Sequence, residues 1–116
     1  MALKRQPEAG DILQGTLDML ILRTLILGPA HGYTIANEIE RTSENALKVE
    51  QGSLYPALYR LQDRGWVSSE WGVSENNRKA KFYRLTNKGR EELNTAAGRW
   101  RRMTHAIDLI LGKTFE

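Results

Sequence analysis

The sequence predicts a mainly α-helical protein of the α+β class, a winged helix-turn-helix with one long C-terminal helix. Three observations support this prediction. The first half of the chain holds three short segments with the apolar spacing of helices. Two short segments rich in β-branched and aromatic residues follow, separated by a polar loop. The last segment has apolar residues seven positions apart, which is typical of a helix packed on another helix.

The composition sets the broad class of protein. The chain has 116 residues, which fits a single domain, and its 41% hydrophobic and 27% charged residues give a globular balance. The absence of cysteine excludes disulfides and thiolate metal sites. The longest apolar region, LDMLILRTLIL, contains Asp18 and Arg23 and is too short to span a bilayer. We therefore expect a soluble, cytoplasmic protein with no membrane partner.

The basic residues are concentrated in one stretch of the chain. The formal net charge of +3 is weak support for an anionic partner when taken alone. Between Ser74 and Arg90, however, there is one acid, Glu75, and the basic residues are Arg78, Lys79, Lys81, Arg84, Lys88 and Arg90. This stretch is where an anionic partner is expected.

The first two helices follow a short arm. Residues 1–11 are predicted to be a flexible, partly basic N-terminal arm, and residues 12–85 the winged-helix domain. The first helix is expected from Leu13 to Leu27, where GPAHG ends it. Its broad apolar face predicts burial on more than one side or contact with a partner chain. The second helix is expected from His31 to Ser43, and residues 47–49 are a candidate short strand.

The third predicted helix, within EQGSLYPALYRLQDRGW (residues 50–66), has two distinct faces. One face has apolar residues at the spacing i, i+3, i+4 and i+7, namely Leu54, Ala57, Leu58 and Leu61. The opposite face carries Gly52, Ser53, Pro56, Tyr59, Arg60 and Asp63, with Tyr55 on the flank. Ser53 or a neighbour is expected to cap the helix, which places Pro56 in the first turn, where its missing N–H costs little. Gly65 ends the helix.

A hairpin and a long helix complete the chain. WVSSEWG and AKFYRL are expected to be strands, with VSENNRK as the polar hairpin tip. Thr86 is expected to cap a helix that ends near Leu111, before Gly112. Its two seams are Leu93, Trp100 and Ile107, and Ala96, Met103 and Ile110. Heptad seams suit packing against a second copy of the chain, so residues 86–112 are assigned to dimerisation.

The order of the elements predicts a winged helix, because a helix-turn-helix is followed directly by a basic hairpin. The chain resembles the PadR family of bacterial transcription regulators over nearly its whole length, and its single last helix is similar to the short subgroup. The resemblance rests on GTLDMLILRTL, GPAHGYTIANEI, VEQGSLYPALYRLQDRGWV, SSEWG and KFYRLTNKGREEL, in this order. It implies a homodimeric repressor, which in some members is released from DNA by a small aromatic ligand.

The candidate DNA-binding residues lie on the third helix and the hairpin. A helix N-terminus lets backbone N–H groups approach a phosphate, and in helix-turn-helix proteins this end carries the contacts. A basic loop beside it can grip phosphate or enter the minor groove. Tyr55 is the first choice, because GSLYPAL resembles the DNA-reading segment of the family. The set is Ser53, Tyr55, Pro56, Tyr59, Arg60, Asn77, Arg78, Lys79 and Lys81, with Lys4 and Arg5 added from the arm.

The last helix holds the candidate dimer and ligand residues. A tryptophan at a seam position is most simply a dimer anchor. The resemblance adds a ligand site, because in some drug-binding members a tryptophan at the position of Trp100 stacks on planar ligands between subunits. Its neighbours here would be Met19, Arg23, Ala97 and Met103, and the arginines nearby favour anionic aromatic ligands. The predicted dimer interface is Leu17, Leu93, Ala96, Trp100, Met103, Ile107, Ile110 and Leu111.

Two functions fit this sequence. The first is a sequence-specific transcription regulator, a repressor that binds pseudo-palindromic double-stranded DNA as a homodimer. The second is a winged-helix module that binds another protein, which the acids near the third helix favour: Glu38, Glu40, Glu44, Glu50 and Asp63. No enzymatic activity, cofactor or metal is expected. His105 has no histidine or carboxylate four residues on, and phosphate-loop and nucleophile-elbow motifs are missing from the sequence.

Overall fold

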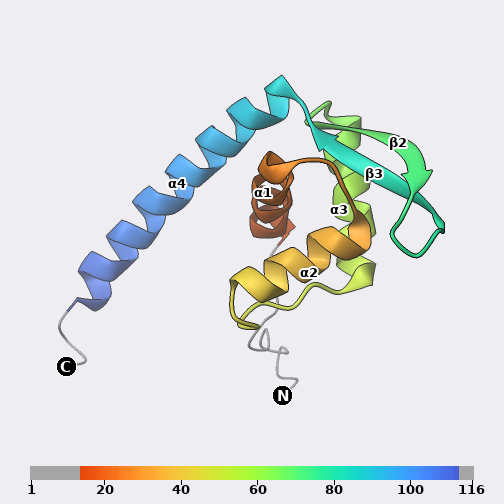
Figure 1. The fold of residues 1–116 in the computed structure, drawn as a ribbon. Helices are drawn as coiled ribbons and strands as arrows, with labels where there is room; N and C mark the ends of the chain where they lie inside the picture. The colour runs from red at the N-terminus through yellow and green to blue at the C-terminus, as the bar shows by residue number, and fades with distance from the viewer. Residues whose placement is uncertain (1–13, 113–116) are drawn as a thin grey trace, which may run out of the picture.

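The computed structural model describes residues 14–112, so the arm at 1–11 with Lys4 and Arg5, and the predicted helix start at Leu13, lie outside the described residues. The α+β winged helix-turn-helix is confirmed: a small sheet lies at one edge of the helical body, and one long helix projects from the other side (Figure 1). The elements are α1 (Gln14–Thr24), the 3-10 turn η1 (Leu25–Leu27), β1 (Ala30–His31), α2 (Gly32–Thr42), α3 (Gln51–Asp63), β2 (Val67–Val73), β3 (Lys79–Leu85) and α4 (Asn87–Leu111). Within residues 14–112, no helix is long and apolar enough to cross a membrane.

The sheet is antiparallel, with the strand order β1-β3-β2. The predicted hairpin is confirmed, and its register runs from Val67 opposite Leu85 to Val73 opposite Lys79. The predicted strand at residues 47–49 is wrong, and the third strand is β1 at Ala30–His31 instead. The physical reason is that the backbone N–H of Val49 donates to the Glu40 carboxylate at 2.8 Å, which removes a donor that a strand would need.

Helix α3 begins at Gln51, as predicted, but its start differs from the predicted cap. Glu50 is the N-cap residue, and its carbonyl accepts from the N–H groups of Ser53 and Leu54 at 3.0 and 2.9 Å. Ser53 therefore lies inside the helix, and Pro56 is the sixth helical residue rather than a first-turn residue. Because proline has no N–H, the carbonyl of Gly52 loses its helical donor. Gly52 is exposed, so water can replace that donor.

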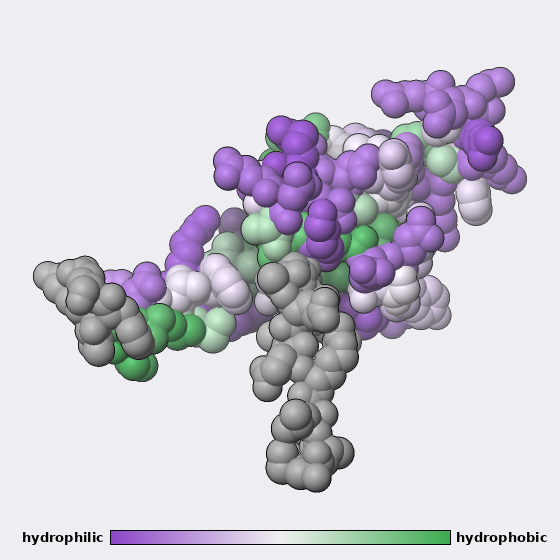
Figure 2. Space-filling model, turned by 90° about the horizontal axis from the view of Figure 1, so that it is seen from below, coloured by the Kyte–Doolittle hydropathy of each residue, from purple (hydrophilic) through white to green (hydrophobic). Residues whose placement is uncertain are grey.

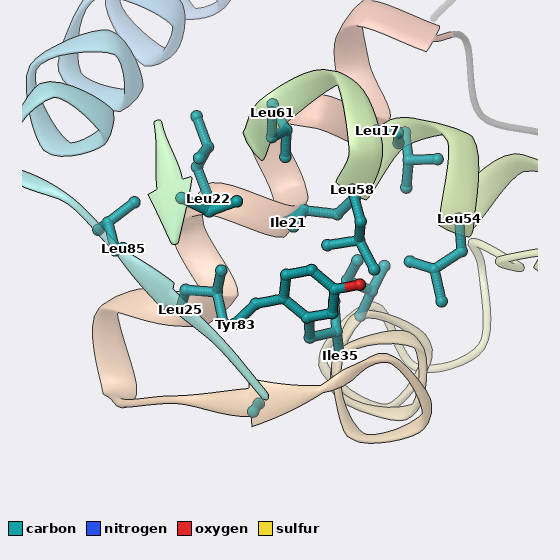
Figure 3. Close-up of a cluster of buried hydrophobic side chains, with 14 of the residues drawn as sticks. Leu17, Ile21, Leu22, Leu25, Ile35, Leu54, Leu58, Leu61, Tyr83 and Leu85 are labelled. Atoms are coloured by element: carbon teal, nitrogen blue, oxygen red, sulfur yellow. The ribbon is translucent and has the colours of Figure 1, made fainter. Parts of the chain in front are cut away.

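The core lies between α1, α2, α3 and the inner face of β3. The predicted apolar face of α3 is confirmed, because all four of its residues are buried. Figure 3 draws the cluster, which includes Leu17, Ile21, Leu22, Leu25, Ile35, Leu54, Leu58, Leu61, Tyr83 and Leu85. Full burial of a leucine or isoleucine side chain contributes about 1.5–3 kcal/mol each. This packing makes the exposed side of α3 a face held on a rigid support.

Helix α4 starts on the body and then leaves it (Figure 1). The predicted cap is confirmed, because the hydroxyl of Thr86 accepts from the Gly89 N–H at 3.0 Å and donates to the Gly65 carbonyl at 2.7 Å. A Cβ on Gly89 would lie 2.1 Å from the Trp66 carbonyl oxygen, so only glycine permits this approach. The predicted end is also confirmed, with Gly112 as the C-cap.

Two residues of the predicted dimer interface lie in the chain's own core. Leu17 is 2% exposed and Leu93 is 5% exposed, because α1 and α4 pack on each other at the base of α4. Both side chains therefore belong to the fold of one chain. The exposed apolar residues of α4 come after this point, and Figure 2 shows a hydrophobic patch at its C-terminal end.

Candidate nucleic-acid interface

An open hollow of about 450 Å³ lies where the start of α2, the first half of α3 and the hairpin meet. Its lining combines aromatic rings with lysines, the residue types that bind nucleic-acid backbones and bases. The lining residues are His31, Gly32, Tyr33, Tyr55, Trp71, Lys79, Ala80, Lys81 and Tyr83. The hollow therefore joins the predicted recognition helix to the predicted wing.

Gly32 and Tyr55 form the floor of the hollow. A Cβ on Gly32 would lie 2.7 Å from the Tyr55 hydroxyl oxygen, so the tyrosine can lie over the first residue of α2 only because that residue is glycine. Tyr83 lies beside them, and its burial, with a smaller contribution from Tyr55, raises the pKa of its phenol. The raised pKa moves the Tyr83 phenol further from ionisation, so it adds no negative charge to the hollow.

The wall of the hollow is the inner face of the hairpin. The register places Lys81 opposite Trp71 and Lys79 opposite Val73, so both lysines share a face with the tryptophan. The Nζ atoms of Lys79 and Lys81 lie 5.0 and 5.9 Å from the centroid of the Trp71 ring, which is 61% exposed. Such cation–π contacts are worth about 0.5–1 kcal/mol at exposed sites and hold the two charges over the hollow.

The exposed face of α3 carries most of the predicted residues. Ser53, Tyr55 and Pro56 are exposed, and Tyr59 is 74% exposed. They lie opposite the buried leucines, so this side of the helix faces solvent while its other side stays in the core. A single helix supported in this way fits the width of a DNA major groove.

The Arg60 side chain does not extend from the exposed face of α3, to which the sequence had assigned it. Its Nη2 donates to Oδ1 of Asp18 on α1 at 2.9 Å, and the two side chains are 26% and 13% exposed. The wheel assigned Arg60 to the outward face, but a long side chain at the edge of that face reaches back to α1. Arg60 is therefore committed to an ion pair in this structure.

The hairpin tip is a defined turn. The N–H of Ser74 donates to the Arg78 carbonyl at 2.8 Å, and the N–H of Asn77 donates to the Ser74 carbonyl at 2.9 Å. Asn77 has a φ of 59°, a left-handed conformation that asparagine adopts more readily than most residues. Asn77, Arg78 and Lys79 are exposed, as expected for the tip of a wing.

The structure also brings in residues that were missing from the predicted site. Gly32 and Tyr33 come from α2, and Trp71 comes from β2. For Trp71 a signal was present, because counting back from the hairpin tip pairs it with Lys81. The contact between Gly32 and Tyr55 had no signal in the sequence, since it depends on how α2 and α3 cross.

The predicted ligand residues lie on α1 and α4. Trp100 and Met103 are partly exposed on α4, and Arg23 is exposed near the end of α1. Ala97 and Met19 are half-buried, one on each helix.

The residues 14–112 contain no cluster of three or more histidine, cysteine or acidic side chains that could hold a metal ion. The acids that favoured a protein-binding module are partly engaged within the chain. Glu38 bonds to Arg41, whose guanidinium lowers the pKa of that carboxyl, and Glu40 accepts from the Val49 N–H. The polar surface near α3 is thus less acidic in effect than the sequence suggested.

Comparison with known proteins identifies the relatives of this chain. The sequence model of the transcriptional regulator PadR-like family matches residues 21–95. A crystal structure of a PadR family transcription regulator from Clostridium difficile is 28% identical, with a TM-score of 0.71, and the match covers 83% of this chain and 98% of that one. A PadR family transcriptional regulator from Eggerthella lenta is 29% identical, with a TM-score of 0.71, over 87% and 86% of the two chains. A Lysinibacillus sphaericus protein called "Uncharacterized protein X" is 30% identical over 101 residues, 87% of this chain and 93% of that protein.

Proposed function

The chain belongs to the PadR-like family of DNA-binding transcription regulators, which are not enzymes, and we propose that it is a cytoplasmic repressor that binds a pseudo-palindromic operator as a homodimer. The observation that carries this proposal is the hollow between α3 and the wing, where Lys79 and Lys81 lie over Trp71 and line the same hollow as Tyr55. Two cations and several tyrosine hydroxyls beside an exposed helix fit a phosphate backbone that passes between the helix and the wing.

In this proposal α3 enters the major groove. Tyr55 and Tyr59 supply hydroxyl groups for base edges or phosphates, and Ser53 and Pro56 allow the helix backbone to come close. The wing residues Asn77, Arg78, Lys79 and Lys81 grip phosphate beside the groove. Tyr55 remains the first choice for specificity, because its side chain lies so close to Gly32 that a Cβ there would meet the hydroxyl at 2.7 Å.

The free part of α4 supports the homodimer. Its exposed apolar residues are Trp100, Met103, Ile107, Leu109, Ile110 and Leu111, which are costly to leave in water together. Packing this face on a second copy would bury it. The two α3 helices of such a dimer would then bind two half-sites whose centres are about 34–36 Å apart, or a multiple of that spacing. The half-buried Ala96, on the same helix, would lie at the start of this interface.

A small aromatic effector remains part of the proposal. The surface near Trp100 would be closed by the second copy, and Met19, Arg23, Ala97 and Met103 would line it. Arg101, Arg102 and Arg23 are exposed around this surface, so they favour a planar anion over a cation. Titration of flavins or phenolic acids against tryptophan fluorescence, with Trp100→Ala as the control, tests it; an unchanged signal in the native protein contradicts it for those compounds.

Selection of bound duplexes from a random DNA pool tests the central proposal. We expect a pseudo-palindromic sequence whose binding is salt-sensitive and far tighter than that of a scrambled duplex. Placing the selected sequence over a promoter should lower transcription in vitro when the protein is added. Weak binding that is equal for all sequences would instead favour the protein-binding module.

A further inference from the structure

The ion pair between Asp18 and Arg60 joins α1 to α3 beneath the exposed face of α3. Asp18 is the buried charged residue of the described core region, and its carboxylate accepts from the Arg60 guanidinium at 2.9 Å. The Nε of Arg60 is also buried and has no acceptor among the described residues. A buried charge of this kind needs its partner, because removal of one leaves the other uncompensated.

The pair differs in kind from the other contacts that hold α3. The buried face of α3 packs through Leu54, Leu58 and Leu61, and such apolar contacts are non-directional. Apolar packing fixes which side of the helix faces inward and gives α3 its rigid support, but these contacts set no hydrogen-bond length or angle. A charge-assisted hydrogen bond has a preferred length and angle, so it sets the position of α3 along and around its axis.

We propose that Arg60 is a positioning residue for DNA recognition, and that with Asp18 it fixes the orientation of α3 from which Tyr55 and Tyr59 read the operator. Arg60 then acts through its contact with Asp18 and makes no contact with DNA. This inference rests on the proposed function, since it assigns a role within DNA recognition.

The two possible roles of Arg60 predict different effects of Asp18→Asn on the affinity for DNA. If Arg60 contacts DNA, loss of the carboxylate frees its guanidinium and removes a repulsive charge, so binding should be unchanged or stronger. If Arg60 positions α3, the helix loses its orientation and specific binding should fall. The expected loss is about tenfold, similar to that of one mismatched base pair.

The salt dependence supplies the second readout. A duplex selected by the native protein and a scrambled duplex of the same length are titrated with each variant at several salt concentrations. A positioning role predicts that the affinity for the selected duplex falls, the affinity for the scrambled duplex stays, and the slope of log K against log salt is unchanged. A phosphate contact by Arg60 predicts that Arg60→Gln makes that slope less negative by about 0.9.

Two further variants complete the test. Glu92→Gln makes the same charge change in the more exposed pair with Arg99 on α4, where Nη2 and Oε2 are 3.6 Å apart, and it should leave specificity unchanged. Asp18→Asn with Arg60→Gln replaces the ion pair by neutral groups that can still hydrogen-bond, so it should fold even if Asp18→Asn does not. Its salt slope should equal that of the native protein.

Unchanged or tighter specific binding by folded Asp18→Asn overturns the inference, and so does a reduced salt slope in the double variant. A native protein that selects no duplex at all would overturn the proposed function, and this inference with it. The thermal unfolding midpoint of each variant is also measured. A midpoint well above the temperature of the binding assay shows that the variant is folded during that assay.

Discussion

The hairpin and the free part of α4 both expose aromatic side chains, and they project from opposite sides of the body (Figure 1). On the hairpin, Trp71 lies under two lysine ammonium groups and beside a hollow that is complete within one chain. On α4, Trp100 begins a stretch whose exposed apolar residues continue with Met103, Ile107, Leu109, Ile110 and Leu111. The comparison teaches that exposed aromatic residues occur here in two settings. The hollow combines them with cations, which in our proposal suits DNA, and the free part of α4 combines them with apolar side chains, which in our proposal suits a second copy.

The largest effect is expected on α4. Ile107→Asp should weaken dimerisation by about 100-fold or more, because each copy loses about 1.5–3 kcal/mol of apolar burial and symmetry doubles the loss. Operator binding should fall with it, since a monomer reaches one half-site. Sedimentation equilibrium at micromolar concentration measures the dimer.

A matched control separates charge from position on α4. Asn94→Asp adds the same acidic side chain at an exposed position in the body-proximal half of the helix, and it should leave the dimer intact. If Ile107→Asp remains a dimer, the free part of α4 is not the dimer interface, and the comparison between the two surfaces fails.

The next effect is expected in the hollow, from Gly32→Ala. The new methyl group would meet the Tyr55 hydroxyl at 2.7 Å, and the tyrosine is the movable partner because the contact is at the free end of its side chain. We expect about tenfold weaker specific binding, the value of one lost base-pair contact, with little change in thermal stability.

Gly15→Ala is the control for this prediction, because a Cβ there would meet nothing within 4 Å among the described residues. Equal operator affinity in Gly32→Ala and Gly15→Ala would show that the place of Tyr55 does not matter for recognition.

The sequence could predict the features that depend on local patterns, but not the contacts between helices. Local patterns were enough for the apolar face of α3, the two strands of the hairpin and the Thr86 cap, because each depends on residues close in sequence. The contacts of Gly32 with Tyr55 and of Asp18 with Arg60 depend on how helices cross, and no local pattern encodes that.

The same limit explains the dimer residues. Heptad spacing placed Leu93 in one seam with Trp100, but the spacing cannot tell where a helix leaves its own body. Leu93 packs in the core, and the exposed part of the seam begins after it. The start of α3 was also predicted differently. A serine near the helix start suggested a side-chain cap, but the N-cap residue is Glu50, whose backbone carbonyl accepts the first helical hydrogen bonds.

A smaller effect is expected from the charges of the wing. Lys79→Ala should weaken binding to all duplexes about two- to fivefold, the value of an exposed ion pair, and make the salt slope less negative by about 0.9. Arg84→Ala is the matched control, because the register places Arg84 on the opposite face of the hairpin, and its effect should be smaller. An unchanged slope in Lys79→Ala would remove this lysine from the interface.

The smallest effect is expected from Trp71, and it tests whether the hollow is preformed. Trp71→Leu keeps both lysines but removes the ring that holds them, which costs about 0.5–1 kcal/mol and so about two- to fivefold in affinity. The salt slope should stay the same, because the number of cations near the phosphates is unchanged. The Trp71→Phe variant has a ring that attracts cations less strongly than tryptophan does. Its affinity for DNA should lie between those of the native protein and Trp71→Leu. A loss well beyond fivefold in Trp71→Leu would mean that the ring itself touches DNA, and the hairpin would then resemble α4 in using its tryptophan for direct contact with a partner.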